Sequence, residues 1–258
     1  MSIMAISNMN ETSVQTDLAM TAEIKLYYDL YIPGKSISPS QENHPDGEAP
    51  PPLLCKEGSP WPLVIAVHGY GAHKRHMMRE ARLVANEQFV IASIQGPHQH
   101  YRRMATEIGF GWLSDYKSEE YVRVHHQFVL DVIEKLGGDE TIDASQVFLY
   151  GFSQACALNF RFAFSYPDVL RGIIGVCGSI PSDLETNENY KPFPAETFYL
   201  YGDDDEFYTQ EKFSGFDTKL STMLPNYRSK HYTAKHEITN EMREDTKQFL
   251  ARQIERNV

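Results

Sequence analysis

The sequence predicts one α/β domain, in which helices cover both faces of a mostly parallel central sheet. After residue 62, short apolar runs alternate with stretches of helical periodicity, the pattern of parallel strands joined by right-handed helical crossovers. The runs are continuously apolar, as expected of strands buried on both faces. A chain of 258 residues, 41% of them hydrophobic, can bury one large core.

The first strand is expected at residues 23–32, because their apolar residues recur with a period of two. These residues are Ile24, Leu26, Tyr28, Leu30 and Ile32. Residues 1–22 precede it as a polar leader, which we expect to be flexible. Residues 33–62 hold eight of the fourteen prolines, so they are predicted to form a long surface loop. The predicted domain therefore spans residues 23–258.

The other strands are expected at residues 63–67, 89–94, 147–150, 172–176, 197–201 and 228–233. The clearest helix covers residues 119–136, where apolar side chains share one side and two glycines, Gly137 and Gly138, follow. Further helices are expected at residues 155–166 and 241–254, the latter docked on the sheet.

Composition and charge exclude several classes of protein. The formal net charge of -11 argues against nucleic-acid binding, which needs a basic face. Because residues 1–21 contain no Lys or Arg, a secretory signal is not expected and we predict a cytoplasmic protein. No apolar run approaches the ~20 residues that span a bilayer. Three scattered cysteines predict reduced thiols rather than disulfides or a zinc cluster.

The clearest chemical motif is Gly151-x-Ser153-x-Ala155, which lies between a predicted buried strand and a predicted helix. A sharp strand-to-helix turn of this kind exposes a serine hydroxyl as a nucleophile, and the turn needs small residues two positions before and after the serine. Gly151 and Ala155 meet that need. In the alternative interpretation, Ser153 only caps the helix. Cys156 is a weaker candidate nucleophile, because a cysteine inside the helix favours a packing role.

A nucleophilic serine of this kind is followed in the chain by an acid and then a histidine, each just beyond a strand. Histidine suits proton transfer near neutral pH. Of the ten histidines, His236 lies beyond the expected last strand and His231 within it, so we predict His236 as the general base. Four candidate acids follow the strand at residues 197–201. They are Asp203, Asp204, Asp205 and Glu206.

Acyl transfer also needs backbone N–H groups directed at the developing oxyanion. One predicted donor is Gln154, which follows the serine at a helix N-terminus, where free amides and the helix dipole favour negative charge. The second is expected in the loop His68-Gly69-Tyr70-Gly71 after the strand at residues 63–67. We assign it to Tyr70, with Gly71 as the alternative.

Five stretches resemble the carboxylesterase and phospholipase group of α/β-hydrolases, which includes acyl-protein thioesterases. They lie at residues 62–69, 141–154, 172–178, 201–205 and 236–238, in the order found in that family. The resemblance implies the α/β-hydrolase fold and an acid three positions after the glycine, which selects Asp205. Three features depart from the family pattern. They are Ala155 in place of a second glycine, Lys235 where a glycine often precedes the histidine, and the proline-rich loop.

The aromatic residues before the helix at 119–136 occupy a position from which similar hydrolases line their substrate pocket. This resemblance implies that Phe110 and Trp112 bind substrate, although a loop packed by its own aromatics is the alternative. Arg102 and Arg103 are candidates to meet an acidic substrate group, but arginines usually face water. The histidine pairs lack a completing carboxylate or cysteine pattern, so no metal and no cofactor are expected.

The leading hypothesis is a serine carboxylesterase that hydrolyses a small-molecule ester or thioester through an acyl-serine intermediate. One alternative is a carbohydrate-ester hydrolase or serine peptidase of the same fold. Another is a ligand-binding member with little turnover. The sequence leaves the acyl group, the alcohol and the oligomeric state open.

Overall fold

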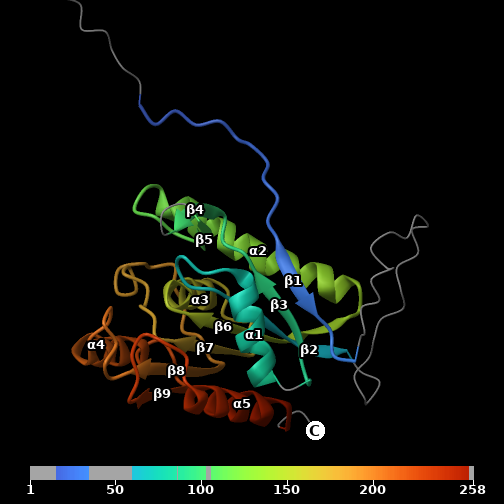
Figure 1. The fold of residues 1–258 in the computed structure, drawn as a ribbon, viewed down its shortest axis with the longest axis vertical. Helices are drawn as coiled ribbons and strands as arrows, with labels where there is room; N and C mark the ends of the chain where they lie inside the picture. Colours follow the sequence, from blue (N-terminus) through green and yellow to red (C-terminus); the bar gives the residue numbers. More distant parts are fainter. Residues whose placement is uncertain (1–15, 35–59, 86, 103–105, 256–258) are drawn as a thin grey trace, which may run out of the picture.

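The computed structural model describes residues 16–34, 60–85, 87–102 and 106–255, and its centre is a seven-stranded sheet (Figure 1). The spatial order is β1-β3-β2-β6-β7-β8-β9. Only β1 runs antiparallel to its neighbour, which confirms the predicted mostly parallel sheet. The strands are β1 Tyr28–Tyr31, β2 Trp61–Val67, β3 Val90–Ile94, β6 Ile142–Phe152, β7 Gly172–Val176, β8 Glu196–Gly202 and β9 Tyr227–Tyr232.

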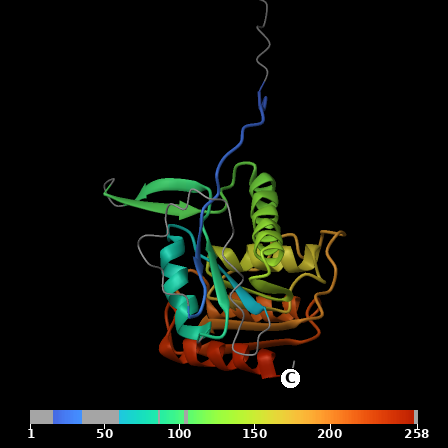
Figure 2. The same cartoon turned by 90° about the vertical axis from the view of Figure 1, so that its right-hand side faces the viewer.

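Helices cover both faces of this sheet, as Figure 2 shows from the side. The helices are α1 Lys74–Ala85, α2 Ser118–Gly138, α3 Gln154–Ser165, α4 Gln210–Leu220 and α5 Asn240–Glu255. The buried side chains of α1 and α5 pack on one face, and those of α2, α3 and α4 on the other. Among the described residues, no helix combines the length and hydrophobicity needed to cross a membrane.

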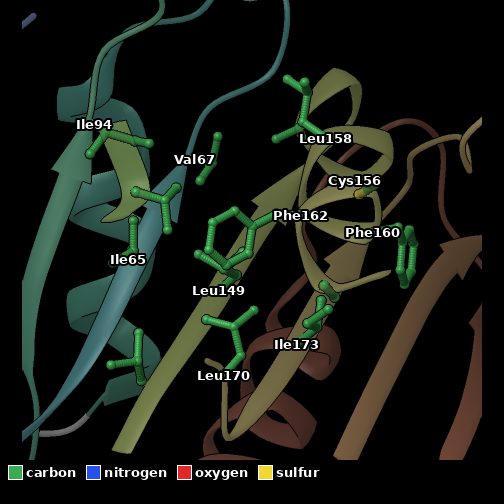
Figure 3. Close-up of a cluster of buried hydrophobic side chains, with 14 of the residues drawn as sticks. Ile65, Val67, Ile94, Leu149, Cys156, Leu158, Phe160, Phe162, Leu170 and Ile173 are labelled. Carbon is green, nitrogen blue, oxygen red and sulfur yellow. The ribbon is translucent and has the colours of Figure 1, made fainter. Parts of the chain in front are cut away.

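The two-sided burial explains why the strand sequences are continuously apolar. In β2, Leu63, Ile65 and Val67 join the cluster under α2 and α3, whereas Val64 and Ala66 join the cluster under α1 and α5. Because successive side chains of a strand point to opposite faces, each face requires its own apolar set. Figure 3 shows the first cluster, in which Phe162 of α3 lies over Leu149 of β6.

Several predicted boundaries differ from the observed ones. The first strand is shorter than predicted, covering residues 28–31 rather than 23–32. Trp61 and Pro62, predicted in the loop, belong to β2, where a register shift accommodates the proline. Residues 35–59 of that loop and residues 1–15 of the leader lie outside the described residues. The α2 helix includes Gly137 and Gly138 and ends directly after them.

The segment predicted as an irregular loop before α2 contains a separate two-stranded hairpin. Its strands are β4 His98–Arg102 and β5 Glu107–Gly111, paired antiparallel. Figure 2 shows this hairpin projecting from the body of the molecule beside α1. An antiparallel bridge between Ala72 and Phe110 attaches it to the loop after β2. The interpretation of this segment as a loop was wrong. Polar residues and glycines make up much of both strands, so they lack the continuous apolar pattern that identified the other strands.

Candidate active site

Three of the predicted site residues, each from a different loop, meet at the carboxyl ends of parallel strands. Ser153 follows β6, Asp205 follows β8 and His236 follows β9. The His236 Nε2 atom lies 2.9 Å from the Ser153 Oγ atom, and the His236 Nδ1 atom lies 2.8 Å from the Asp205 Oδ2 atom. These distances describe one chain of hydrogen bonds from carboxylate through imidazole to hydroxyl.

Ser153 lies in the sharp turn that the motif predicts. Its φ of 57° and ψ of -120° belong to a strained region for a non-glycine residue. The turn is held by the Ser153 N–H, which donates to the Val176 carbonyl at 2.9 Å. A Cβ atom at Gly151 would lie 2.5 Å from the Asn159 Nδ2 atom and 3.2 Å from the Ala155 Cβ atom. A side chain at 151 would therefore displace the buried Asn159 amide, whereas the methyl group of Ala155 fits.

The Ser153 side chain makes no capping bond to α3, and its hydroxyl faces His236 instead. A residue that only capped the helix would adopt ordinary extended backbone angles and would not need the strained conformation of Ser153. Cys156 lies inside α3 and is fully buried, and burial raises the pKa of its thiol above the usual range. Its thiol also donates to the Gly151 and Val176 carbonyls.

The structure separates Asp205 from its acidic neighbours. Asp205 is 5% exposed, and its second oxygen, Oδ1, accepts from the N–H groups of Phe207 and Tyr208 at 2.8 and 2.9 Å. Both oxygens are thus fixed, one by backbone and one by His236. Asp203 contacts the exposed His231 instead, with 3.0 Å between the His231 Nδ1 and Asp203 Oδ1 atoms. The two candidate bases, His236 and His231, therefore belong to two separate carboxylate–histidine pairs.

Glu206 has a different role from Asp205, since it contacts the backbone rather than the ring of the histidine. The Glu206 carboxylate accepts from the His236 N–H at 3.2 Å. The backbone N–H of Glu206 itself and this bond from His236 lower the pKa of the Glu206 carboxyl group. Asp204 is exposed.

The loop after β2, residues 68–72, lies against the serine turn. A Cβ atom at Gly69 would be 2.9 Å from the Ser153 Cβ atom, so only glycine permits this approach. The Gly71 N–H donates to the Phe110 carbonyl at 2.7 Å, so the alternative assignment of Gly71 as an oxyanion donor is corrected. In the described part of the chain, the N–H groups of Tyr70 and Gln154 have no backbone acceptor.

Gln154 also holds the segment opposite it through its side chain, a contact that the sequence did not reveal. The Gln154 Oε1 atom accepts from the Trp112 N–H at 2.9 Å, and the Gln154 Nε2 atom donates to the Leu113 carbonyl at 3.1 Å. The residue after the serine thus joins the serine turn to the end of the hairpin.

The predicted substrate contact of Trp112 requires a correction. Trp112 is only 1% exposed, and its indole N–H donates to the His68 carbonyl at 2.9 Å. Phe110 is partly buried and packs edge-on against His73. Two aromatic rings other than those of Phe110 and Trp112 are exposed at the site. Tyr70 is 65% exposed and Phe207 is 62% exposed, and the Phe207 ring lies 4.7 Å from that of His236.

His68 is a buried residue that anchors the loop before Tyr70. Its Nε2 atom lies 2.9 Å from the Gly96 N–H nitrogen and 2.7 Å from the Gln95 Nε2 atom. Its Nδ1 atom lies 2.8 Å from the Gly69 carbonyl oxygen. Because Nε2 accepts and Nδ1 donates in this arrangement, the ring is neutral. Burial lowers the pKa of His68 to about 4.

Acidification should therefore destabilise the protein through His68. Its folded-state pKa of about 4 lies below the usual histidine value of 6.5, so the unfolded chain binds a proton first as the pH falls. Stability from this residue is complete above pH 6.5 and decreases towards pH 4, by about 3 kcal/mol in total. Urea unfolding of the wild type and of His68→Gln at pH 7.5 and 4.5 measures this loss of stability. An equal loss in both proteins would contradict this expectation.

The chain is similar to known esterases in sequence and in fold. Residues 51–254 match the family model described as phospholipase/carboxylesterase. A curated relative from Nocardia uniformis subsp. tsuyamanensis, named "Putative esterase NocK", is 28% identical over 149 residues. That stretch covers 56% of this chain and 40% of the relative, so the chain spans less than half the length of the relative that it matches.

Solved structures of esterases share the fold. The Bacillus cereus carboxylesterase superposes with a TM-score of 0.61 at 14% identity, covering 88% of this chain and 94% of its own. The Zea mays acyl-protein thioesterase 2 gives a TM-score of 0.60 at 13% identity, covering 78% of this chain and 97% of its own. At such low identity, these likenesses establish the α/β-hydrolase fold.

Proposed function

The chain belongs to the phospholipase/carboxylesterase family, and we propose that it is a serine esterase acting on a carboxylic ester or thioester through an acyl-serine intermediate. The observation that carries the proposal is the unbroken contact from Asp205 through His236 to Ser153, with 2.8 and 2.9 Å between the bonded atoms. Nucleophile, base and orienting acid are thus within the reach that acyl transfer requires.

In the proposed first step, the Ser153 Oγ atom attacks the acyl carbon and its proton passes to the His236 Nε2 atom. Asp205 accepts from the Nδ1–H group, which keeps Nε2 free as the acceptor and stabilises the imidazolium once it forms. His236 then gives the proton to the departing alkoxide or thiolate. The product of this step is an ester of Ser153 with the acyl group.

The oxyanion of the tetrahedral intermediate is proposed to accept from the N–H groups of Tyr70 and Gln154. Both groups lack a backbone partner among the described residues, and Gln154 begins the twelve-residue helix α3, whose dipole favours negative charge there. In the second half of the reaction, His236 takes a proton from water, the hydroxide attacks the acyl carbon, and the Ser153 oxygen leaves with that proton.

The test of this proposal is the detection of the acyl-serine itself. When the wild-type protein is mixed rapidly with p-nitrophenyl butyrate, we expect a burst of one nitrophenolate per site before the steady state. Acid quenching should trap protein carrying one butyryl group, detectable by intact mass. Steady turnover with no trapped adduct at any time would contradict the mechanism. An adduct that persists without turnover would favour a ligand-binding protein instead.

A chain-length series then separates the alternatives within the fold. We propose hydrolysis of moderately sized esters because the exposed ring of Phe207 offers apolar surface beside His236, and the exposed ring of Tyr70 lies in the loop that approaches Ser153. Activity should therefore persist from acetyl to octanoyl p-nitrophenyl esters. A sharp preference for acetyl esters would favour a carbohydrate-ester hydrolase.

A further inference from the structure

Arg102, at the end of the β4 strand, has its side chain fixed over the loop that carries Tyr70. The Arg102 Nη1 atom donates to the Gly71 carbonyl at 3.0 Å. The methylene groups of the arginine pass over Gly109, where a Cβ atom would lie 2.6 Å from the Arg102 Cδ atom and 2.7 Å from the Gly71 oxygen. Glycine at 109 is therefore required for the arginine and the loop to meet.

This position places the guanidinium group within reach of a substrate bound at the serine. Gly71 is two residues from Gly69, which lies against Ser153, and two residues of chain span at most about 7 Å. Arg102 is exposed, and a guanidinium has five N–H donors. The contact with Gly71 uses one of them, so further donors remain for a ligand.

The charge of Arg102 is not neutralised by a nearby acid. The formal net charge of the chain is -11, yet no ion pair involves Arg102 among the described residues. Glu107 is opposite Arg102 in the hairpin register but forms no ion pair with it. Glu80, on the adjacent helix α1, binds Arg243 through both oxygens.

A second cationic feature adjoins Arg102 on the same side of the loop. The first turn of α1 contains no acidic residue. Arg75 in this turn and Arg79 in the next are exposed. Besides burial, the positive charges of Arg79 and Arg102 lower the pKa of His76. An exposed concentration of positive charge beside a reacting centre attracts anionic ligands.

We propose that Arg102 forms a subsite for a carboxylate carried by the ester substrate, a few carbon atoms from the acyl carbon that Ser153 attacks. This inference rests on the proposed esterase function. The planar guanidinium matches a carboxylate bidentately. The Tyr70 ring, stacked on His100 with 4.9 Å between ring centroids, forms the adjoining wall. The substrate class is therefore a monoester or monothioester of a dicarboxylic acid.

Two esters of equal chain length test the subsite. The anionic substrate is mono-p-nitrophenyl glutarate, and the neutral one is p-nitrophenyl valerate. We expect Arg102→Gln to lower the ratio of kcat/KM for the anionic ester to kcat/KM for the neutral ester by about 10- to 100-fold. The loss should appear mainly in KM. Arg102→Lys, which keeps the charge but not the planar fork, should give an intermediate ratio.

The control is Arg171→Gln. Arg171 precedes β7 at the amino ends of the parallel strands, whereas the site lies at their carboxyl ends, so this variant should leave the ratio at the wild-type value. If Arg102 only supported the Gly71 loop, Arg102→Gln would slow both esters equally and the ratio would not change, which would overturn the subsite. That result is distinct from a failure of the proposed function, in which the wild type would hydrolyse neither ester; this outcome would overturn both proposals.

Discussion

Ser153→Ala should hydrolyse p-nitrophenyl esters 10³- to 10⁶-fold more slowly than the wild type, with little change in KM. The alanine cannot form the acyl intermediate, and water must then attack without a positioned nucleophile. Substrate binding should persist, because the N–H groups of Tyr70 and Gln154 and the exposed rings of Tyr70 and Phe207 are unaffected. Steady-state kinetics measures both constants, and circular dichroism verifies that the variant is folded.

Ser165→Ala is the matched control for this variant. Ser165 is the last residue of α3, the helix that begins immediately after Ser153, and it is exposed. We expect wild-type kcat and KM from it. If Ser153→Ala retained activity within tenfold of the wild type, Ser153 would not be the nucleophile.

Asp205→Asn should reduce kcat by about 10⁴-fold while leaving the protein folded. The carboxylate accepts from the Nδ1 side of His236, which keeps the opposite nitrogen as the base. An asparagine can present an N–H group there, which favours the tautomer with its proton on Nε2, the atom that faces Ser153. It also removes the negative charge that stabilises the imidazolium. The kcat of each purified variant measures the loss.

Asp203→Asn provides the comparison that distinguishes the two carboxylate–histidine pairs. Asp203 contacts His231 at 3.0 Å, and the His231 side chain is 61% exposed. Replacing Asp203 by Asn should leave kcat within about threefold of the wild type, as expected for a surface ion pair. A loss of several orders of magnitude in Asp203→Asn, with Asp205→Asn nearly normal, would reverse the assignment.

The parts of the fold that follow from local pattern were predicted from the sequence. The strands at 63–67 and 172–176 are apolar without interruption because helices cover both faces, and this signal is strong at short range. The hairpin β4–β5 lacks such a signal. Its strands contain His98, His100 and Arg102 facing Gly111, Gly109 and Glu107, and its place depends on the bridge to Ala72.

The candidate site was likewise predicted from the sequence only in part. The sequence predicted the residues that structure brings into contact, Ser153, Asp205 and His236, because each occupies a motif position beyond a strand. It preferred Tyr70 as the second oxyanion donor but kept Gly71 as an alternative, since excluding Gly71 depends on a hydrogen bond to Phe110 in the hairpin. Nor did it show that Trp112 is covered. The sequence could have indicated the exposed ring of Phe207 as a site residue, because Phe207 directly follows the acid motif.

The most direct test of the central proposal is covalent labelling with a fluorophosphonate probe, followed by identification of the modified peptide. The probe reacts with a serine that an adjacent base activates. We predict one adduct on the Ser153 hydroxyl in the wild type, none in Ser153→Ala, and much slower labelling in His236→Gln than in His231→Gln. An esterase-active preparation that remains unlabelled, or an adduct on another residue that accounts for the activity, would contradict the proposal.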